Sequence, residues 1–304
     1  MKYKTIFIPG LAIVIFLFGC KYQQGHSEKT EFAVPDSLTL NASSELHQEA
    51  MEGIIENLAS PVEVAAMLND MGVPYSGNLL VSTKIVENLN TNFQKALMLG
   101  VLSADLGYLN IYRKNTSIID YISSIKYITD ELNVGQFYDF TTLKRLSENK
   151  HDLDSLMYIS VRSFNQMNSH LGKTNRTNIS SLVITGLWLE GIYLATQVAK
   201  DFPSHEISES IGEQKIIMED LFSVIENHKD KPGFNDLIAH LNLLKHEFDN
   251  VEITYEIGEP ETVEDENGML VIIQNEESIV HITDDQLNKI INRTSKIRNH
   301  FIEK

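Results

Sequence analysis

Two apolar stretches decide the fold. They are FQKALMLGVLSADLGYLNIY at residues 93–112 and SSLVITGLWLEGIYLATQV at residues 180–198. Each is long enough for about five turns of α-helix, and each is apolar almost all the way round the helix. A helix of that kind is buried on every side rather than along one stripe. We therefore expect these two helices to form the central pair of the fold, with the other helices packed around them as a bundle.

The helices expected around this pair are amphipathic. One begins near Asp152 and is expected to end at Gly172, and another follows Pro232. A serine or threonine followed three residues later by glutamate or glutamine forms a capping box at a helix start. This pattern occurs at residues 60–63 (SPVE) and again at residues 283–286 (TDDQ), just before the last helix.

Residues 251–282 break the helical pattern. Val251, Ile253, Tyr255 and Ile257 alternate with polar residues, which is typical of a strand with one apolar face. The Asn-Gly pair at 267–268 is a turn signal, and a β-branched run follows at 271–273. We expect a β-hairpin, or three strands, before the C-terminal helix. The predicted fold class is mainly α, a multi-helix bundle at residues 44–304 with a small β-hairpin excursion at about 251–282.

Each central stretch carries one acid, Asp105 or Glu190, three residues before a tyrosine, Tyr108 or Tyr193. A lone buried carboxylate is very costly, so each acid must be paired or neutralised. In one interpretation the two acids converge with both tyrosines and Trp188 around a pocket for a small ligand. In the other, each acid accepts hydrogen bonds from a tyrosine, serine or arginine and fixes the register of its helix. Paired carboxylates also catalyse sugar hydrolysis, but nothing in the sequence fixes their separation.

The start of the chain resembles the signal of a bacterial lipoprotein. Lys2 and Lys4 precede an apolar run at 6–18, which is shorter than the ~20 residues that a membrane-spanning helix needs. Residues 17–20 (LFGC) resemble a lipobox, and Cys20 is the only cysteine. The resemblance implies cleavage before Cys20 and attachment of three acyl chains to it. The expected organisation is a signal peptide at 1–19, a lipidated polar tether at 20–43 and a helical domain at 44–304.

The residues after Cys20 bear on location. In enteric lipoproteins an aspartate at the next position retains the protein at the inner membrane, and here Lys21 occupies that position. Residues 21–24 (KYQQ) also lack the acidic cluster that resembles a surface-export tag. The resemblance therefore implies a lipid anchor in the outer membrane of the cell envelope, facing the periplasm. The implied partners are the bilayer, through acylated Cys20, and an envelope protein.

The charge of the chain excludes one class of partner. Aspartate and glutamate number 42 against 25 lysines and arginines, which gives a net charge of −17. Such a surface repels phosphates, so we expect no binding to nucleic acid. Basic residues nevertheless gather on the last predicted helix, at Lys289, Arg293, Lys296 and Arg298. We interpret them as its solvated face; the alternative is that they dock an acidic partner or the acidic hairpin of the protein itself.

The sequence contains no recognised catalytic or metal-binding motif. Ten histidines occur without His-x-x-x-His or HExxH, and the spacing of His240 and Glu247 on one helix face is not a recognised ligand spacing. The acidic run at 264–268 does not fit an EF-hand, because Val263 stands where an aspartate is required. Nucleophile elbows and phosphate-binding loops are also missing. We therefore expect no metal, no cofactor and no enzymatic activity.

These features favour a membrane-anchored envelope lipoprotein that acts as a non-enzymatic interaction or scaffold module. The body resembles the uncharacterised helical lipoproteins of Gram-negative envelopes only in general character, which implies no activity. The alternative is a small-molecule binding protein with a pocket between the two central helices. An exposed apolar stripe on the β excursion or on an outer helix would support the first hypothesis. Closed packing around Asp105 and Glu190 would count against the second.

Overall fold

The computed structural model describes residues 71–148, 153–258, 260–264, 270–273 and 276–302, together with Met51 and Ile54. The predicted signal peptide and tether, and the helix start at 60–63, lie outside these residues. Within them the predicted fold class is confirmed. The helices are α3 (Asn92–Ile111), α4 (Asn115–Glu131), α5 (Phe140–Glu148), α6 (Leu153–Lys173), α7 (Thr177–Asp201), α8 (His205–Ile225), α9 (Phe234–Asp249) and α10 (Asp284–Ile302).

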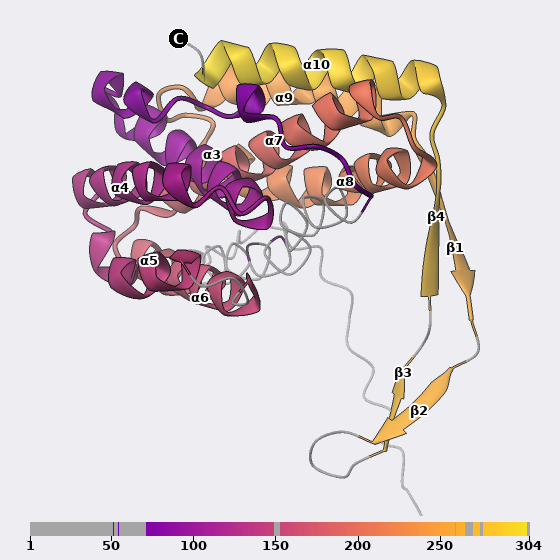
Figure 1. The fold of residues 1–304 in the computed structure, drawn as a ribbon. Helices are drawn as coiled ribbons and strands as arrows, with labels where there is room; N and C mark the ends of the chain where they lie inside the picture. The colour runs from indigo at the N-terminus through magenta and orange to yellow at the C-terminus, as the bar shows by residue number, and fades with distance from the viewer. Residues whose placement is uncertain are drawn as a thin grey trace, which may run out of the picture.

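Helices α3 and α7 are the central pair, as their sequences predict, and they share the most extensive contact between helices in the described part of the chain (Figure 1). Their backbones cross at Gly100 and Gly186. A β-carbon at Gly100 would overlap the carbonyl oxygen of Val183, and one at Gly186 would overlap that of Leu97. Only glycine permits so close an approach. Helix α7 is long and apolar enough to cross a membrane, but it is buried almost throughout among the other helices.

The ends of the surrounding helices follow from local residues. Helix α6 continues past Gly172, where the sequence predicts its end. The chain turns at Asn175 instead, whose φ of 60° lies in the left-handed region that asparagine tolerates. The predicted capping box before α10 is confirmed, because the Gln286 backbone N–H donates to the Thr283 hydroxyl (3.3 Å) and the Thr283 N–H donates to the Gln286 side chain (2.7 Å).

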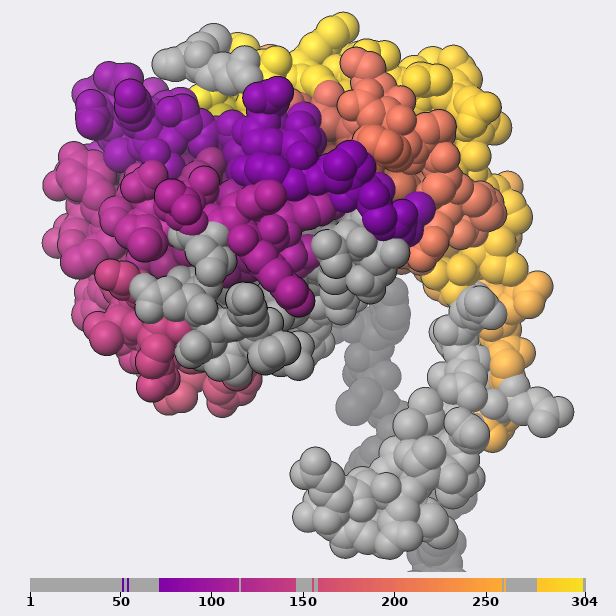
Figure 2. Space-filling view, viewed as in Figure 1, coloured from indigo at the N-terminus to yellow at the C-terminus, as the bar shows by residue number. Residues whose placement is uncertain are grey.

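The excursion before α10 is a hairpin, which we call the β-arm (residues 252–281). Its described strands are β1 (Glu252–Ile257), β2 (Glu261–Glu264), β3 (Leu270–Ile273) and β4 (Glu276–His281). Strand β1 pairs antiparallel with β4, and β2 pairs antiparallel with β3. Figure 1 shows the β-arm running away from the helical body, and the coloured part of the arm in the space-filling view extends beyond the rounded mass of helices (Figure 2).

The root of the β-arm is fixed to α8. Val251 and Val280 are buried, and Val280 lies against Gly212, where a β-carbon would overlap the valine side chain. The hydroxyl of Ser278 donates to a carboxylate oxygen of Glu213 at 2.9 Å. The β-arm is therefore anchored by apolar and polar contacts at one end, which sets the direction in which it leaves the body.

Candidate functional site

An ion pair between α7 and α10 lies in the interior. The Arg298 guanidinium donates through Nε and Nη2 to the two carboxylate oxygens of Glu190, at 3.1 and 3.0 Å. Nη2 also donates to the Leu79 carbonyl oxygen at 3.1 Å, and the guanidinium lies 4.3 Å from the centroid of the Tyr193 ring. Burial lowers the pKa of the Arg298 guanidinium, but the hydrogen bonds and negative charge of Glu190 raise it by more. The net effect is a raised pKa. The prediction that Arg298 belongs to a solvated face is wrong, because the side chain is buried.

Asp105 on α3 is held differently. Its Oδ2 accepts a hydrogen bond from the Val81 backbone N–H at 2.9 Å, and the Tyr121 hydroxyl donates to the Val81 carbonyl oxygen. The other oxygen, Oδ1, has no hydrogen-bond partner among the described residues. Burial, and next the negative charge of Glu190, raise the pKa of Asp105 well above its ordinary value. The two acids are therefore close enough to interact electrostatically, and both effects favour the neutral form of Asp105 over its ionised form.

The other three predicted site residues do not share one environment. The Tyr108 hydroxyl accepts from the Ser76 backbone N–H at 3.1 Å. Tyr193 packs on Arg298, as described above. Trp188 is two residues from Glu190 and so lies on the opposite side of α7, where its indole N–H donates to the Gln214 side chain on α8 at 3.1 Å. The structure thus gathers the two acids and Tyr193 around Arg298, and places Trp188 elsewhere.

This interior is shielded from solvent. Asp105, Tyr108, Trp188 and Glu190 are each no more than 1% exposed. The contacts agree with the second interpretation, in which the acids fix the positions of the helices. Arg298 ties α7 to α10, and Asp105 ties α3 to the segment that contains Val81. A ligand pocket between α3 and α7 stays a prediction.

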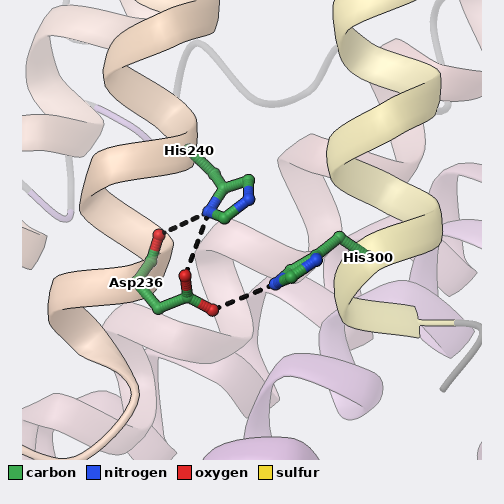
Figure 3. A group of neighbouring side chains, drawn as sticks. All are labelled: Asp236, His240 and His300. Atoms are coloured by element: carbon green, nitrogen blue, oxygen red, sulfur yellow. Dashed lines mark hydrogen bonds and ion pairs between the residues drawn. The ribbon is translucent and has the colours of Figure 1, made fainter.

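A second group of titratable residues lies between α9 and α10. We call Asp236, His240 and His300 the histidine cluster (Figure 3). Nδ1 of His240 lies 3.2 Å from one carboxylate oxygen of Asp236, and Nε2 of His300 lies 3.0 Å from the other. The two imidazole rings stack with centroids 4.2 Å apart and planes 24° apart. Imidazole nitrogen and carboxylate oxygen are ligands of late transition-metal ions.

Sequence reasoning missed the histidine cluster because one of its members is distant in the chain. Asp236 and His300 are 64 residues apart. The available signal was Asp-x-x-x-His at residues 236–240, which places both side chains on one helix face. Glu247, which the sequence places on the same helix face as His240, instead contacts Arg293 at 3.4 Å.

The third feature is the apolar face of the β-arm. Residues in alternate positions of a strand share a face, so Ile253, Tyr255 and Ile257 lie on one side of β1. Ile253 packs against the core, whereas Tyr255 is 56% exposed and Ile257 is 73% exposed. In the described residues each strand of the β-arm has a single neighbour, so one edge of each is unpaired.

Comparisons of the chain with known protein families, curated proteins and solved structures found no match.

Proposed function

We propose that the protein is a lipid-anchored lipoprotein of the outer membrane, facing the periplasm, that acts as a non-enzymatic interaction module. Its partner is an envelope protein that binds the β-arm. The observation that carries this proposal is the apolar face of β1, which continues from the half-buried Ile253 to the exposed Tyr255 and Ile257. Large apolar side chains gathered on an exposed surface are typical of interaction sites.

The architecture of the β-arm supports the same role. A two-stranded hairpin is only marginally stable alone in water, and unpaired strand edges pair readily with another chain. Binding by strand addition uses the backbone groups of such an edge for affinity, and pockets for alternate side chains for specificity. The unpaired strand edges among the described residues offer backbone groups to a partner strand. The alternate apolar side chains of β1 can fill pockets on that partner.

The charge of the β-arm indicates the chemistry of the partner. Residues 252–277 contain nine acidic residues and no lysine, arginine or histidine. Complementary charge speeds association and selects the correct partner. We therefore propose a partner that presents an apolar strand or groove bordered by lysines and arginines.

The anchor and the interior complete the proposal. The lipobox resemblance at residues 17–20 supports acylation of Cys20, and three acyl chains exceed the two signals that stable anchoring requires. The acids of the central pair are occupied by structural contacts with Arg298 and with the Val81 backbone. The small-molecule alternative would need this closed interior to open, so we prefer the interaction module.

Site-specific photo-crosslinking in intact cells tests the proposal. A photoreactive phenylalanine replaces Tyr255 in one variant and Ile257 in another. The matched control carries it in place of Tyr158, which is 66% exposed on a different element, α6. All three variants present the probe on the surface of the same folded body.

The expected result is one discrete crosslinked protein from positions 255 and 257, with no such product from position 158. The product should weaken at high salt, because the proposed partner is basic. Equal crosslinking from all three positions would contradict the assignment to the β-arm. The absence of any product from positions 255 and 257 would contradict the proposed function itself.

A further inference from the structure

We propose that the histidine cluster binds one divalent late transition-metal ion, with Zn²⁺ as its representative. This site is separate from the β-arm and does not depend on the proposed interaction. The ligands are one carboxylate oxygen of Asp236, one imidazole nitrogen of His240 and one of His300. Their ligand atoms all lie within 4.8 Å of one another.

The distances already approach those of a metal centre. A tetrahedral zinc ion with ligands at about 2.1 Å holds neighbouring ligand atoms about 3.4 Å apart. Nδ1 of His240 lies 3.2 Å from one carboxylate oxygen of Asp236 and Nε2 of His300 lies 3.0 Å from the other, so the carboxylate must rotate to bring one oxygen to both nitrogens. Side-chain rotation alone can therefore admit an ion between the three groups, because both helices already hold the side chains together (Figure 3).

The scaffold restricts where these side chains can go. Asp236 and His240 are one turn apart on α9, a spacing that places both on the same face. The edge of the Phe301 ring packs against both imidazoles, with centroids 5.3 Å from His240 and 4.7 Å from His300. The α10 backbone near His300 is fixed by the buried contact of Arg298 with Glu190. Such support around the ligands is what a metal site requires.

The protonation of the cluster is compatible with metal exchange. Nδ1 of His240 also lies 2.8 Å from the Asp236 backbone carbonyl oxygen, which accepts a hydrogen bond from it in the tautomer that carries a proton on Nδ1. A bound ion would take the lone pair of this nitrogen, and the ring proton would then sit on Nε2 of the same imidazole. One ion would then join the carboxylate and both stacked imidazoles, and would link α9 to α10.

The surroundings allow the ion to enter. The Asp236 side chain is 56% exposed and both imidazoles are 30% exposed. Three protein ligands leave one coordination position for water or for a ligand from another molecule. The net charge of −17 raises the local concentration of cations. Two imidazoles with one carboxylate favour zinc and its neighbours over Mg²⁺ and Ca²⁺, which prefer oxygen ligands.

Calorimetric titration of the full-length protein in detergent with Zn²⁺ tests the proposal. His240→Ala and His300→Ala each remove one ligand. His246→Ala is the matched control, because His246 is exposed on the same helix α9 and lies outside the cluster. Thermal melting without metal checks that all variants fold, and Co²⁺ serves as a second probe whose visible spectrum reports coordination by nitrogen and oxygen.

We expect one Zn²⁺ per chain in the wild-type protein and in His246→Ala, with no competition from Mg²⁺ or Ca²⁺. Each ligand variant should bind at least about tenfold more weakly, and Zn²⁺ should raise the Tm of the wild type but not of these variants. Equal binding by the wild type and both ligand variants would overturn the site. So would an equal loss in His246→Ala, which would indicate adventitious surface binding.

Discussion

The charge of Arg298 is compensated in the interior by one carboxylate. Its side chain is 4% exposed, and its guanidinium binds both oxygens of the fully buried Glu190. A bidentate pair of this kind is strong because two parallel hydrogen bonds add to the charge attraction. Removal of one partner leaves the other charge buried and unpaired, which is far more costly than the absence of both.

Arg298→Met is therefore expected to lower the free energy of unfolding by about 3–5 kcal/mol. The double variant Arg298→Met with Glu190→Leu should recover most of this loss, since no charge then remains buried. Lys296→Met is the control, because Lys296 is exposed on the same helix, and its effect should stay within about 0.5 kcal/mol. Urea denaturation measures all three. An Arg298→Met variant as stable as Lys296→Met would contradict the assigned role.

Asp105 predicts a dependence of stability on pH. Burial, and then Glu190, raise the pKa of this carboxyl above its ordinary value of 3.8. The folded protein therefore keeps a proton that the unfolded chain releases, so the contribution of Asp105 to stability is greatest below about pH 3.8 and is lost as pH rises through the folded pKa. An asparagine side chain at this position cannot ionise and avoids this loss.

Asp105→Asn should accordingly gain stability relative to the wild type as pH rises from about 4 to 8, by up to about 1.4 kcal/mol per pH unit. Urea denaturation at several pH values measures this difference. A difference that stays constant over the whole range would show that the pKa of Asp105 is not raised in the folded state.

At the scale of the elements, the crossing of α3 and α7 depends on two glycines. Gly100→Ala and Gly186→Ala each introduce a methyl group where the backbone of the other helix lies. Each should destabilise the protein by about 1–3 kcal/mol or more. Gly172→Ala on α6 is the matched control, because its added β-carbon would meet no side chain and no other segment of the described chain within 4 Å.

The control Gly172→Ala is expected to stabilise the protein, in contrast to the two variants at the crossing. Alanine in place of glycine stabilises a protein by about 0.4–1 kcal/mol where the native backbone suits both residues. Gly172 has no positive φ, so Gly172→Ala should raise the melting temperature. Thermal denaturation of the three variants compares them directly. Similar changes in melting temperature for all three variants would mean that the crossing of α3 and α7 does not require glycine.

The central helices could be predicted from sequence because apolarity on all sides of a helix is a local property of residues 93–112 and 180–198. The hairpin could be predicted from strand alternation in the same way. The partner of Glu190 could not, since Arg298 is 108 residues away on a helix with a polar sequence. The histidine cluster likewise joins residues 64 apart. Contacts between distant elements depend on how helices pack, and residue patterns along the chain do not specify that.

At the scale of the whole molecule, the anchor is expected to depend on one residue. Cys20→Ser removes the only thiol that can accept lipid. The wild-type chain should fractionate with membranes and carry the mass of three acyl chains on Cys20. The variant should carry no lipid and lose the mature membrane-bound form. A wild-type chain that retains residues 1–19 and has an unmodified Cys20 would contradict the lipoprotein proposal.

The central claim is that this anchored body recruits an envelope protein through the β-arm. The most direct measurement is a native mass spectrum of the protein extracted gently from its own membranes, compared with that of a Tyr255→Ser, Ile257→Thr variant. Both changes remove exposed apolar surface without disturbing the buried root of the β-arm. The account predicts a stoichiometric second protein on the wild-type chain and none on the variant. A wild-type chain without a partner, or a variant that keeps it fully, would contradict the account.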